Sequence, residues 1–231
     1  MKFGKSAISI IFLSIFNNAL CSELQNETYS LFFESPSFIF STKNQKVQID
    51  GKNSQLLSND IYFIANPAVT IKRGDAVVDI DSSEAKYFQD LQKLEFLDSV
   101  NFYISNEENS LDIRTEELFV DIKKAMMNSK KKTVTIFDNI EVTSIGMNLT
   151  YFDRGYNADF AKADIQIKSK ELEHSGYANE ISMISKDNEL IMKGNAYLYK
   201  DGFKISADLI HYNFKNNKII RSVNSTIQSN S

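Results

Sequence analysis

The chain has 231 residues, of which 42% are hydrophobic, so it is long enough to bury a core and too apolar to be disordered. Its formal net charge is −4, which argues against binding to a nucleic-acid backbone, because such binding needs a basic stripe. We therefore expect a folded domain with no nucleic-acid partner.

The first 21 residues have the composition of an export signal. Lys2 and Lys5 precede an apolar run over residues 7–16, which is shorter than the ~20 residues needed to span a bilayer. Small residues, Ala19 and Cys21, stand at the −3 and −1 positions of a possible cleavage site. We predict a signal peptide over 1–21 that is cleaved after Cys21, with an uncleaved membrane anchor as the alternative. A lipoprotein is disfavoured because Leu20 stands where a small residue is expected.

From residue 29 onward, short stretches of alternating apolar and polar residues predict β-strands joined by turns. The first of these strands are expected at residues 29–33, 37–41, 46–50, 60–65, 69–71 and 76–80. Residues 83–92 are ambiguous: Ala85, Phe88 and Leu91 would share one face of a helix, whereas the repeat described below favours strand, turn and strand.

The middle of the chain continues the same alternation. Strands are expected at residues 93–105, 111–113, 118–122, 133–137, 140–144, 148–151 and 163–167. The charge run 130–132 is predicted to be the solvated tip of a hairpin, with contact to lipid phosphates as the alternative. Residues 168–179 show the weakest pattern and could be a seam before a final module.

The alternation is clearest over residues 188–228, where it predicts short antiparallel strands. Asp201-Gly202 is the strongest hairpin signal in the chain, because glycine accepts the positive φ of a tight turn. Further turns are expected at 193–195 and 215–217.

The spacing of apolar residues around Ile205 recurs around Ile80 and Ile113, and more weakly around Ile49. A single such unit of strands cannot bury its own apolar face, so the copies must share an interior. We therefore predict a nearly all-β fold: an elongated, twisted antiparallel β jelly roll or open barrel made of repeated short strands.

Two parts of the chain resemble known families. The phrase Gly194-Asn195-Ala196, followed by residues 202–212 and 218–220, resembles the repeat of the organic-solvent-tolerance N-terminal family, which includes LptA-type periplasmic bridges. It departs from that repeat in having Ala196 in place of valine and Asn213 in place of aspartate. The earlier region is similar to LptC-type domains in four phrases: Asn66-Pro67-x-Val69, Ser83-x-Ala85-x-Tyr87, Leu94-x-Phe96-x-Asp98-x-Val100 and Leu111-x-Ile113-x-Thr115-x-x-Leu118.

The resemblance implies a periplasmic protein that binds lipopolysaccharide and passes its lipid A acyl chains along an apolar trough. It further implies an LptC-like body over 22–167 and an LptA-like module over 168–231. Implied partners are lipopolysaccharide, other Lpt-type β jelly rolls joined by edge-strand addition and, if the chain is LptC-like, an inner-membrane ABC transporter complex. The edge strands expected to pair with partners are 38–40 and 222–228. Candidate lipid-binding residues are those of inward parity: Phe102, Ile104, Leu111, Ile113, Leu118, Val120, Leu198, Phe203 and Ile205.

Motifs for other chemistry are missing from the sequence. His174 and His211 have no acid or cysteine at metal-ligand spacing, and the chain contains no Gly-rich phosphate loop or nucleophile elbow. We therefore expect no enzyme activity, no metal and no cofactor. The competing interpretation is a structural or adhesive surface protein of β repeats with a packed core and no ligand.

Overall fold

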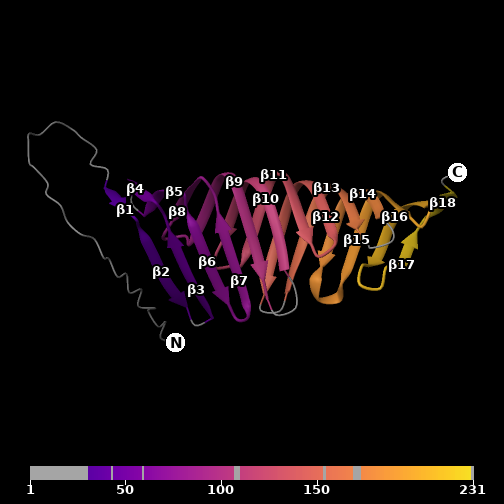
Figure 1. Cartoon of the computed structure of the whole chain (residues 1–231), viewed down its shortest axis with the longest axis horizontal. Coiled ribbons are helices and arrows are strands. Elements are labelled where there is room, and N and C mark those ends of the chain that lie inside the picture. Colours follow the sequence, from indigo (N-terminus) through magenta and orange to yellow (C-terminus); the bar gives the residue numbers. More distant parts are fainter. Residues whose placement is uncertain are drawn as a thin grey trace, which may run out of the picture.

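The computed structural model describes residues 31–42, 44–58, 60–106, 110–152, 155–168 and 173–229; the predicted signal peptide lies outside them. The described residues form an 18-stranded sheet in an elongated body, with the strands stacked along its long axis (Figure 1). All strand pairs are antiparallel. The predicted all-β, elongated antiparallel fold is therefore confirmed.

The strands have the following bounds, with one short 3-10 helix, η1, between β14 and β15: β1 Phe32–Glu34, β2 Ser37–Thr42, β3 Gln45–Asp50, β4 Asn53–Ser58, β5 Ile61–Ala65, β6 Ala68–Arg73, β7 Ala76–Asp81, β8 Glu84–Phe88, β9 Lys93–Ser105, β10 Ser110–Asp121, β11 Met126–Phe137, β12 Ile140–Phe152, β13 Gly155–Lys168, β14 Glu173–Ile184, η1 Ser185–Asp187, β15 Glu189–Lys200, β16 Phe203–Asn213, β17 Lys218–Val223 and β18 Thr226–Ser229.

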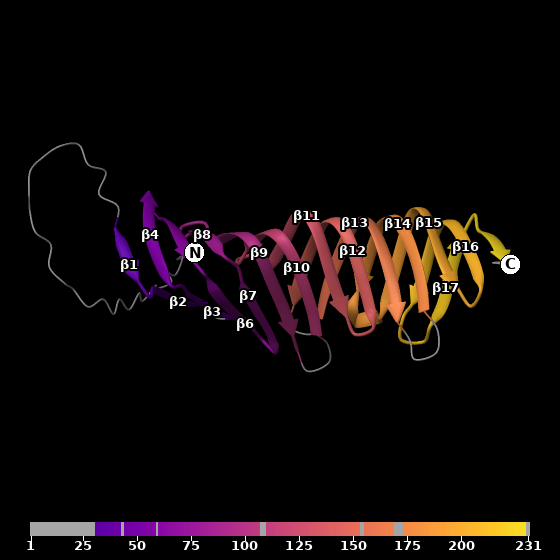
Figure 2. The same ribbon diagram turned by 45° about the horizontal axis from the view of Figure 1, so that its top comes forward.

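The chain runs back and forth, and each pass crosses two layers. Strand β9 shows the arrangement, because its first half pairs with β8 and its second half pairs with β7. We call one such pass a rung. The early rungs are pairs of short strands, such as β3 with β4, whereas β9 to β16 are long strands with a bend in the middle. The two layers, named the β7 layer and the β8 layer, face each other across the apolar interior (Figure 2).

Several of the bends use left-handed backbone, and in alternate rungs such bends recur about every 32 residues. Positive φ angles occur at Ser35, Asn66, Asp98 and Asn195, with Asn and Asp tolerating this conformation better than most residues. The residues 193–195, predicted as a turn, are therefore a bend inside β15. Likewise, residues 130–132 lie in the bend of β11 and not at a hairpin tip, because β11 continues on both sides of them.

Other local predictions are confirmed. Asp201 and Gly202 form the β15–β16 turn, with φ angles of 52° and 81°. The segment 83–92 contains strand β8 and a turn, as the repeat indicated, and not a helix. At the weakly patterned residues 168–179, where a boundary between modules was suspected, β14 pairs with both β13 and β15. The hydrogen-bonded ladder is therefore continuous from β13 to β15.

One row of inward residues crosses the whole sheet in the β7 layer, each member directly opposite the next. It contains Ile49, Ile80, Ile113 and Ile205, around which the apolar spacing of the sequence recurs, so the predicted repetition corresponds to equivalent positions in rungs that lie an even number of rungs apart. We call this set the inner row: Phe38, Ile49, Val69, Ile80, Phe102, Ile113, Thr135, Val142, Ile165, Gly176, Leu198, Ile205 and Ile227.

Buried hydroxyl groups sit beside the bends of the central rungs. The Thr115 Oγ1 and Ser129 Oγ atoms are 2.9 Å apart, and the Thr115 hydroxyl donates to the Lys132 carbonyl at 3.1 Å. The Ser129 hydroxyl accepts the Lys131 N–H at 3.1 Å. These bonds satisfy backbone groups that the ladder loses where β11 bends.

Among the described residues, no helix is long and apolar enough to cross a membrane.

Candidate functional site

The interior between the two layers is the candidate site, and its central part is filled by the chain's own side chains. Seven of the predicted lipid-binding residues are at most 1% exposed: Phe102, Ile104, Leu111, Ile113, Leu118, Val120 and Leu198. The expected open trough is therefore not present along the central rungs. Contact of these residues with lipid stays a prediction.

The register brings these residues together in neighbouring rungs. Phe102 lies opposite Ile113, and Ile104 lies opposite Leu111. Leu118 and Val120 lie in the other half of β10, beyond its bend, and so belong to the β8 layer. Leu198 faces Ile205 across the last long hairpin. The predicted set therefore lines both layers of one interior.

Contacts between residues far apart in sequence join the two layers along the turn ends of the rungs. Phe137 of the β7 layer meets Phe214 of the β8 layer, with ring centroids 5.2 Å apart. Arg73 lies over the Tyr151 ring, 6.0 Å from its centroid. Burial raises the pKa of Tyr151 to about 12, so this ring stays neutral at physiological pH. We call this line of contacts the seam.

Near the C-terminal end, the seam contains a polar cluster inside an otherwise apolar interior. The Lys200 ammonium donates to the Asn217 Oδ1 at 3.1 Å and to the Asp201 carboxylate at 2.8 Å. The Tyr212 hydroxyl donates to the same Asn217 oxygen at 2.5 Å. His174 also belongs to this cluster. Its chain neighbour Ser175 lies opposite Tyr199, the chain neighbour of Lys200, in the β14–β15 ladder. We call these five residues the polar cluster.

The polar cluster has a buried floor and an exposed rim. His174 and Tyr212 are each 1% exposed, whereas Asp201 and Asn217 lie at the surface. Burial lowers the pKa of His174, and the nearby Lys200 ammonium lowers it further. Burial also raises the pKa of Tyr212 to about 12. At neutral pH, Lys200 is therefore the one cation of this cluster, and the imidazole is neutral.

At the N-terminal end the interior opens onto a group of aromatic rings. Phe38 of β2 lies 4.9 Å from the Tyr62 ring and 5.6 Å from the Tyr87 ring, centroid to centroid. Phe40 stacks on Tyr87 at 6.2 Å. Phe38, Phe40 and Tyr62 are only half-buried, in contrast to the sealed centre. Burial raises the pKa of both tyrosines, so these rings present a neutral surface.

At the C-terminal end the interior is also open. Phe203 is 46% exposed, and Ile205 is half-buried. Ile227, opposite Ile205 on β18, is 67% exposed. The remaining two predicted lipid-binding residues, Phe203 and Ile205, therefore lie at an opening, whereas the other seven lie in the closed centre.

Both ends of the sheet have free edges. Within the described residues, β2 pairs only with β3, and β18 pairs only with β16. Neither β2 nor β18 contains a charged residue. Natural edge strands usually carry charges or prolines that prevent pairing with another chain. The predicted pairing edges, 38–40 and 222–228, are thus located at the two free ends.

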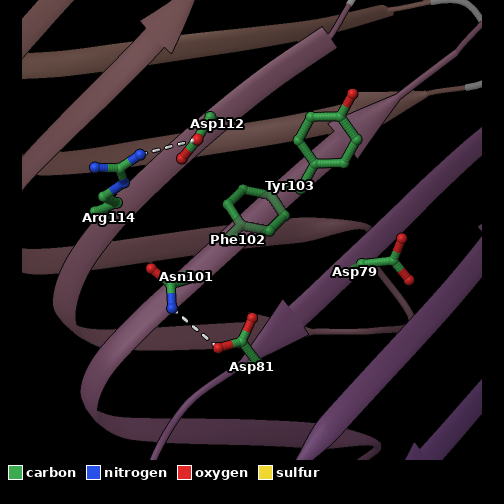
Figure 3. A pocket seen from close by; sticks show the side chains of 7 residues that line it. All are labelled: Asp79, Asp81, Asn101, Phe102, Tyr103, Asp112 and Arg114. Carbon is green, nitrogen blue, oxygen red and sulfur yellow. Dashed lines mark hydrogen bonds and ion pairs between the residues drawn. The ribbon is translucent and has the colours of Figure 1, made fainter.

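The outer face of the β7 layer carries a polar hollow of about 370 Å³ (Figure 3). The Asn101 amide donates to Asp81 at 2.9 Å, and Arg114 lies 3.4 Å from Asp112. Asp79 adds a third carboxylate to this hollow. Because acids outnumber the single arginine, the hollow is unsuited to an anionic ligand.

Residues 41–154 match the family model described as "Lipopolysaccharide-assembly, LptC-related". This segment begins near the end of β2, contains all of β3 to β12 and includes the sealed centre of the interior. Residues 41–154 belong to the LptC-related family. The LptC-related segment lies inside the predicted LptC-like body, and the rungs after residue 154 repeat its architecture.

The chain is also similar to the crystal structure of LptH from Pseudomonas aeruginosa, described as the LptA-homologous periplasmic component of the conserved lipopolysaccharide transport device. The identity is 11% and the TM-score is 0.47, over 51% of this chain and 93% of LptH. No curated protein matches the chain. The family assignment therefore depends on the LptC-related segment.

Sequence reasoning missed the polar cluster, although one signal for it was present. Lys200 follows Leu198 by two positions on an alternating strand, so its side chain should point inward like that of Leu198. Only 14% of the Lys200 side chain is exposed. The alternation of side chains along the strand is therefore enough to show that Lys200 points inward. Its partner Asn217 could not have been identified without the fold.

Proposed function

We propose that this protein carries lipopolysaccharide in the periplasm, as one link of a bridge from the inner to the outer membrane, and holds lipid A acyl chains against its inner row. The observation that carries the proposal is the inner row itself. It runs from one free edge of the sheet to the other and is exposed at the C-terminal end and half-buried at the N-terminal end. Membership of residues 41–154 in the LptC-related family supports it.

The energetics of lipid binding favour such a row. Burial of each acyl methylene contributes about 0.8 kcal/mol, so a chain of a dozen methylenes gains about 10 kcal/mol on leaving water. Acyl chains would enter at the open ends and reach the centre where the two layers part along the seam. Parting the layers need not break ladder hydrogen bonds, because each half of a strand pairs with the neighbouring strands of its own layer. The two layers stay joined through the bends.

The free edges fit partners of the same architecture. An uncharged edge strand with unpaired N–H and C=O groups accepts a further strand, and pairing two edges would bring two inner rows into line. We propose that β2 and β18 pair in this way with other Lpt-type β jelly rolls. An LptC-like role would place the inner-membrane ABC transporter complex at one end of that chain.

We further propose that residues 22–167 act as the LptC-like body and that residues 168–231 act as an LptA-like module continuing the same sheet. The unbroken ladder between β13 and β14 supports a continuous sheet across that boundary. In this proposal the protein transports a lipid and catalyses no reaction.

Photo-crosslinking tests the proposal. A benzophenone amino acid is placed at Phe203, at Phe102 or, as an outward control, at Tyr103, and the purified protein is irradiated with lipopolysaccharide. We expect capture at Phe203 first, weaker capture at Phe102 and none at Tyr103, because Tyr103 lies on the outer face. Equal capture at Phe102 and Tyr103 would contradict an interior route.

The sealed centre favours a second function, a structural or adhesive β-repeat protein with a packed core. That function predicts no capture of lipopolysaccharide at either Phe203 or Phe102, whatever the lipid concentration. The same experiment therefore separates the two functions.

A further inference from the structure

The polar cluster at the C-terminal end has a feature that packing alone does not explain. The ring of His174 is buried and incompletely paired: among the described residues, only the Asn217 side chain comes close enough to interact with it as a hydrogen-bond partner. Leaving a buried polar group without a full set of hydrogen bonds is energetically costly. A buried and incompletely paired imidazole beside a lysine leaves hydrogen-bonding capacity that a polar ligand can use.

Lys200, the cation of the cluster, is only weakly paired. The Lys200 ammonium contacts Asp201 at 2.8 Å, but the Asp201 side chain is 49% exposed, so water screens this pair. The Asn217 oxygen accepts from both Lys200 and Tyr212, which directs that side chain into the cluster. A stronger anion could therefore replace Asp201 at Lys200 while the lysine stays in place.

An apolar surface adjoins the polar cluster directly. Phe203 lies opposite Lys200 across the β15–β16 turn, and Ile205 follows on the same strand. Ile227 lies opposite Ile205 and is the most exposed member of the inner row. A cation and an exposed apolar strip thus lie within a few residues of each other, which is the pairing that an anionic amphiphile requires.

We propose that His174, Lys200 and Asn217 form a binding site for the phosphate headgroup of an amphiphile whose alkyl chains lie on Ile205 and Ile227. The inference rests on the proposed function, since it places the headgroup of the transported lipid. It adds a headgroup site at the C-terminal opening, where the lipid would leave the inner row.

The chemistry of the site follows from its donors. The Lys200 ammonium forms a charge-assisted hydrogen bond with a phosphate oxygen, which is about twice as strong as a bond between neutral groups. The Asn217 amide nitrogen supplies a further donor. A phosphate beside His174 favours the protonated imidazole, so the ring gains a proton and donates to a phosphate oxygen. Asp201 turns back to water.

The test uses the full chain and two probes: bisphosphorylated lipid A and the same lipid with both phosphates removed. We expect the phosphorylated lipid to bind more tightly, and Lys200→Met to weaken it about tenfold while leaving the dephosphorylated lipid unchanged. Methionine retains much of the apolar stem of lysine, so packing is largely preserved. Lys193→Met, an exposed lysine on the same strand, is the matched control and should change neither affinity.

A second measurement separates a binding role from a structural one. Imidazole resonances of His174, titrated by NMR, should show a raised pKa with phosphorylated lipid A and no change with the dephosphorylated form. Lys200→Arg, which keeps the charge, should retain the preference for the phosphorylated lipid. If inorganic phosphate at millimolar concentration displaces the phosphorylated lipid, the site binds free phosphate and the headgroup assignment is wrong.

The outcomes also separate this inference from the proposed function. If both lipids bind equally well and Lys200→Met changes neither, the headgroup site is refuted while lipid transport stands. If neither lipid binds at any concentration, the proposed function fails and the headgroup site fails with it.

Discussion

Replacing Phe102 by alanine distinguishes a packed core from an open lipid trough. Phe102 is 1% exposed and lies opposite both Ile80 and Ile113, so its ring contacts neighbouring rungs on both sides. Removing a fully buried phenylalanine side chain costs about 3–5 kcal/mol, from lost burial and from the cavity left behind. In a chain of this length that corresponds to a fall in Tm of about 6–20 °C.

The measurement is urea unfolding followed by far-UV circular dichroism, with Tyr103→Ala as the control. Tyr103 is the next residue of β9 but is 44% exposed, so its replacement should cost less than about 1 kcal/mol. A cost for Phe102→Ala no greater than that of the control, at an unchanged m-value, would refute the packed centre. It would mean that the ring borders a space already filled by water or lipid.

Three further predictions concern other parts of the structure. Gly176→Ala should destabilise the protein by about 1–3 kcal/mol in urea unfolding, because a Cβ there would clash with the Tyr197 carbonyl oxygen, whereas Ser175→Ala, at an exposed neighbouring position, should be neutral. The free energy of unfolding should fall as the pH is lowered from 7 to 5.5, because the pKa of His174 is lowered in the folded chain and the unfolded chain therefore binds a proton more readily. His174→Gln should reduce this dependence on pH, and the same dependence in the variant would contradict a role of His174. Ile39→Lys on β2 should leave stability within about 0.5 kcal/mol, since Ile39 is 48% exposed, but should reduce any edge-to-edge association seen by analytical ultracentrifugation.

The inner row shows which features of the fold the spacing of apolar residues predicts. Ile49, Ile80, Ile113 and Ile205 were related by the spacing of their apolar neighbours alone, and the structure places all four on one line across the sheet. The spacing is informative because each pair of rungs needs the same number of residues to cross both layers twice. Fold class and inward parity were therefore predictable from the sequence.

The bends were harder to predict than the strands. Residues 193–195 and 130–132 contain the glycine, asparagine and clustered charges that also mark turns. A bend within a strand and a turn between strands need the same local conformations, such as the positive φ of Gly194 and Asn195. Whether the chain then reverses or continues depends on which strand pairs with it, and the local sequence does not contain that information.

The separation of the two layers was likewise beyond the sequence. Inward parity is the same for a residue in a solid core and for one that lines a trough. The difference is decided by contacts between distant residues, such as Arg73 with Tyr151 and Phe137 with Phe214. The closed centre of the interior could therefore not be predicted, whereas the residues that fill it could.

A closed centre and a transport role are compatible if lipid replaces side-chain contacts instead of filling a standing cavity. An acyl methylene that takes the place of a side-chain methylene restores similar apolar burial, so the exchange itself changes the free energy little. The cost of opening then lies mainly in the few polar contacts of the seam, such as Lys200 with Asn217 and the Gln45 amide with the Ile122 carbonyl at 3.4 Å. Hydrogen bonds of this kind contribute about 1 kcal/mol each. A lipid headgroup that supplies a new partner for Lys200 would offset one of these losses at the C-terminal opening, so the seam should part there first.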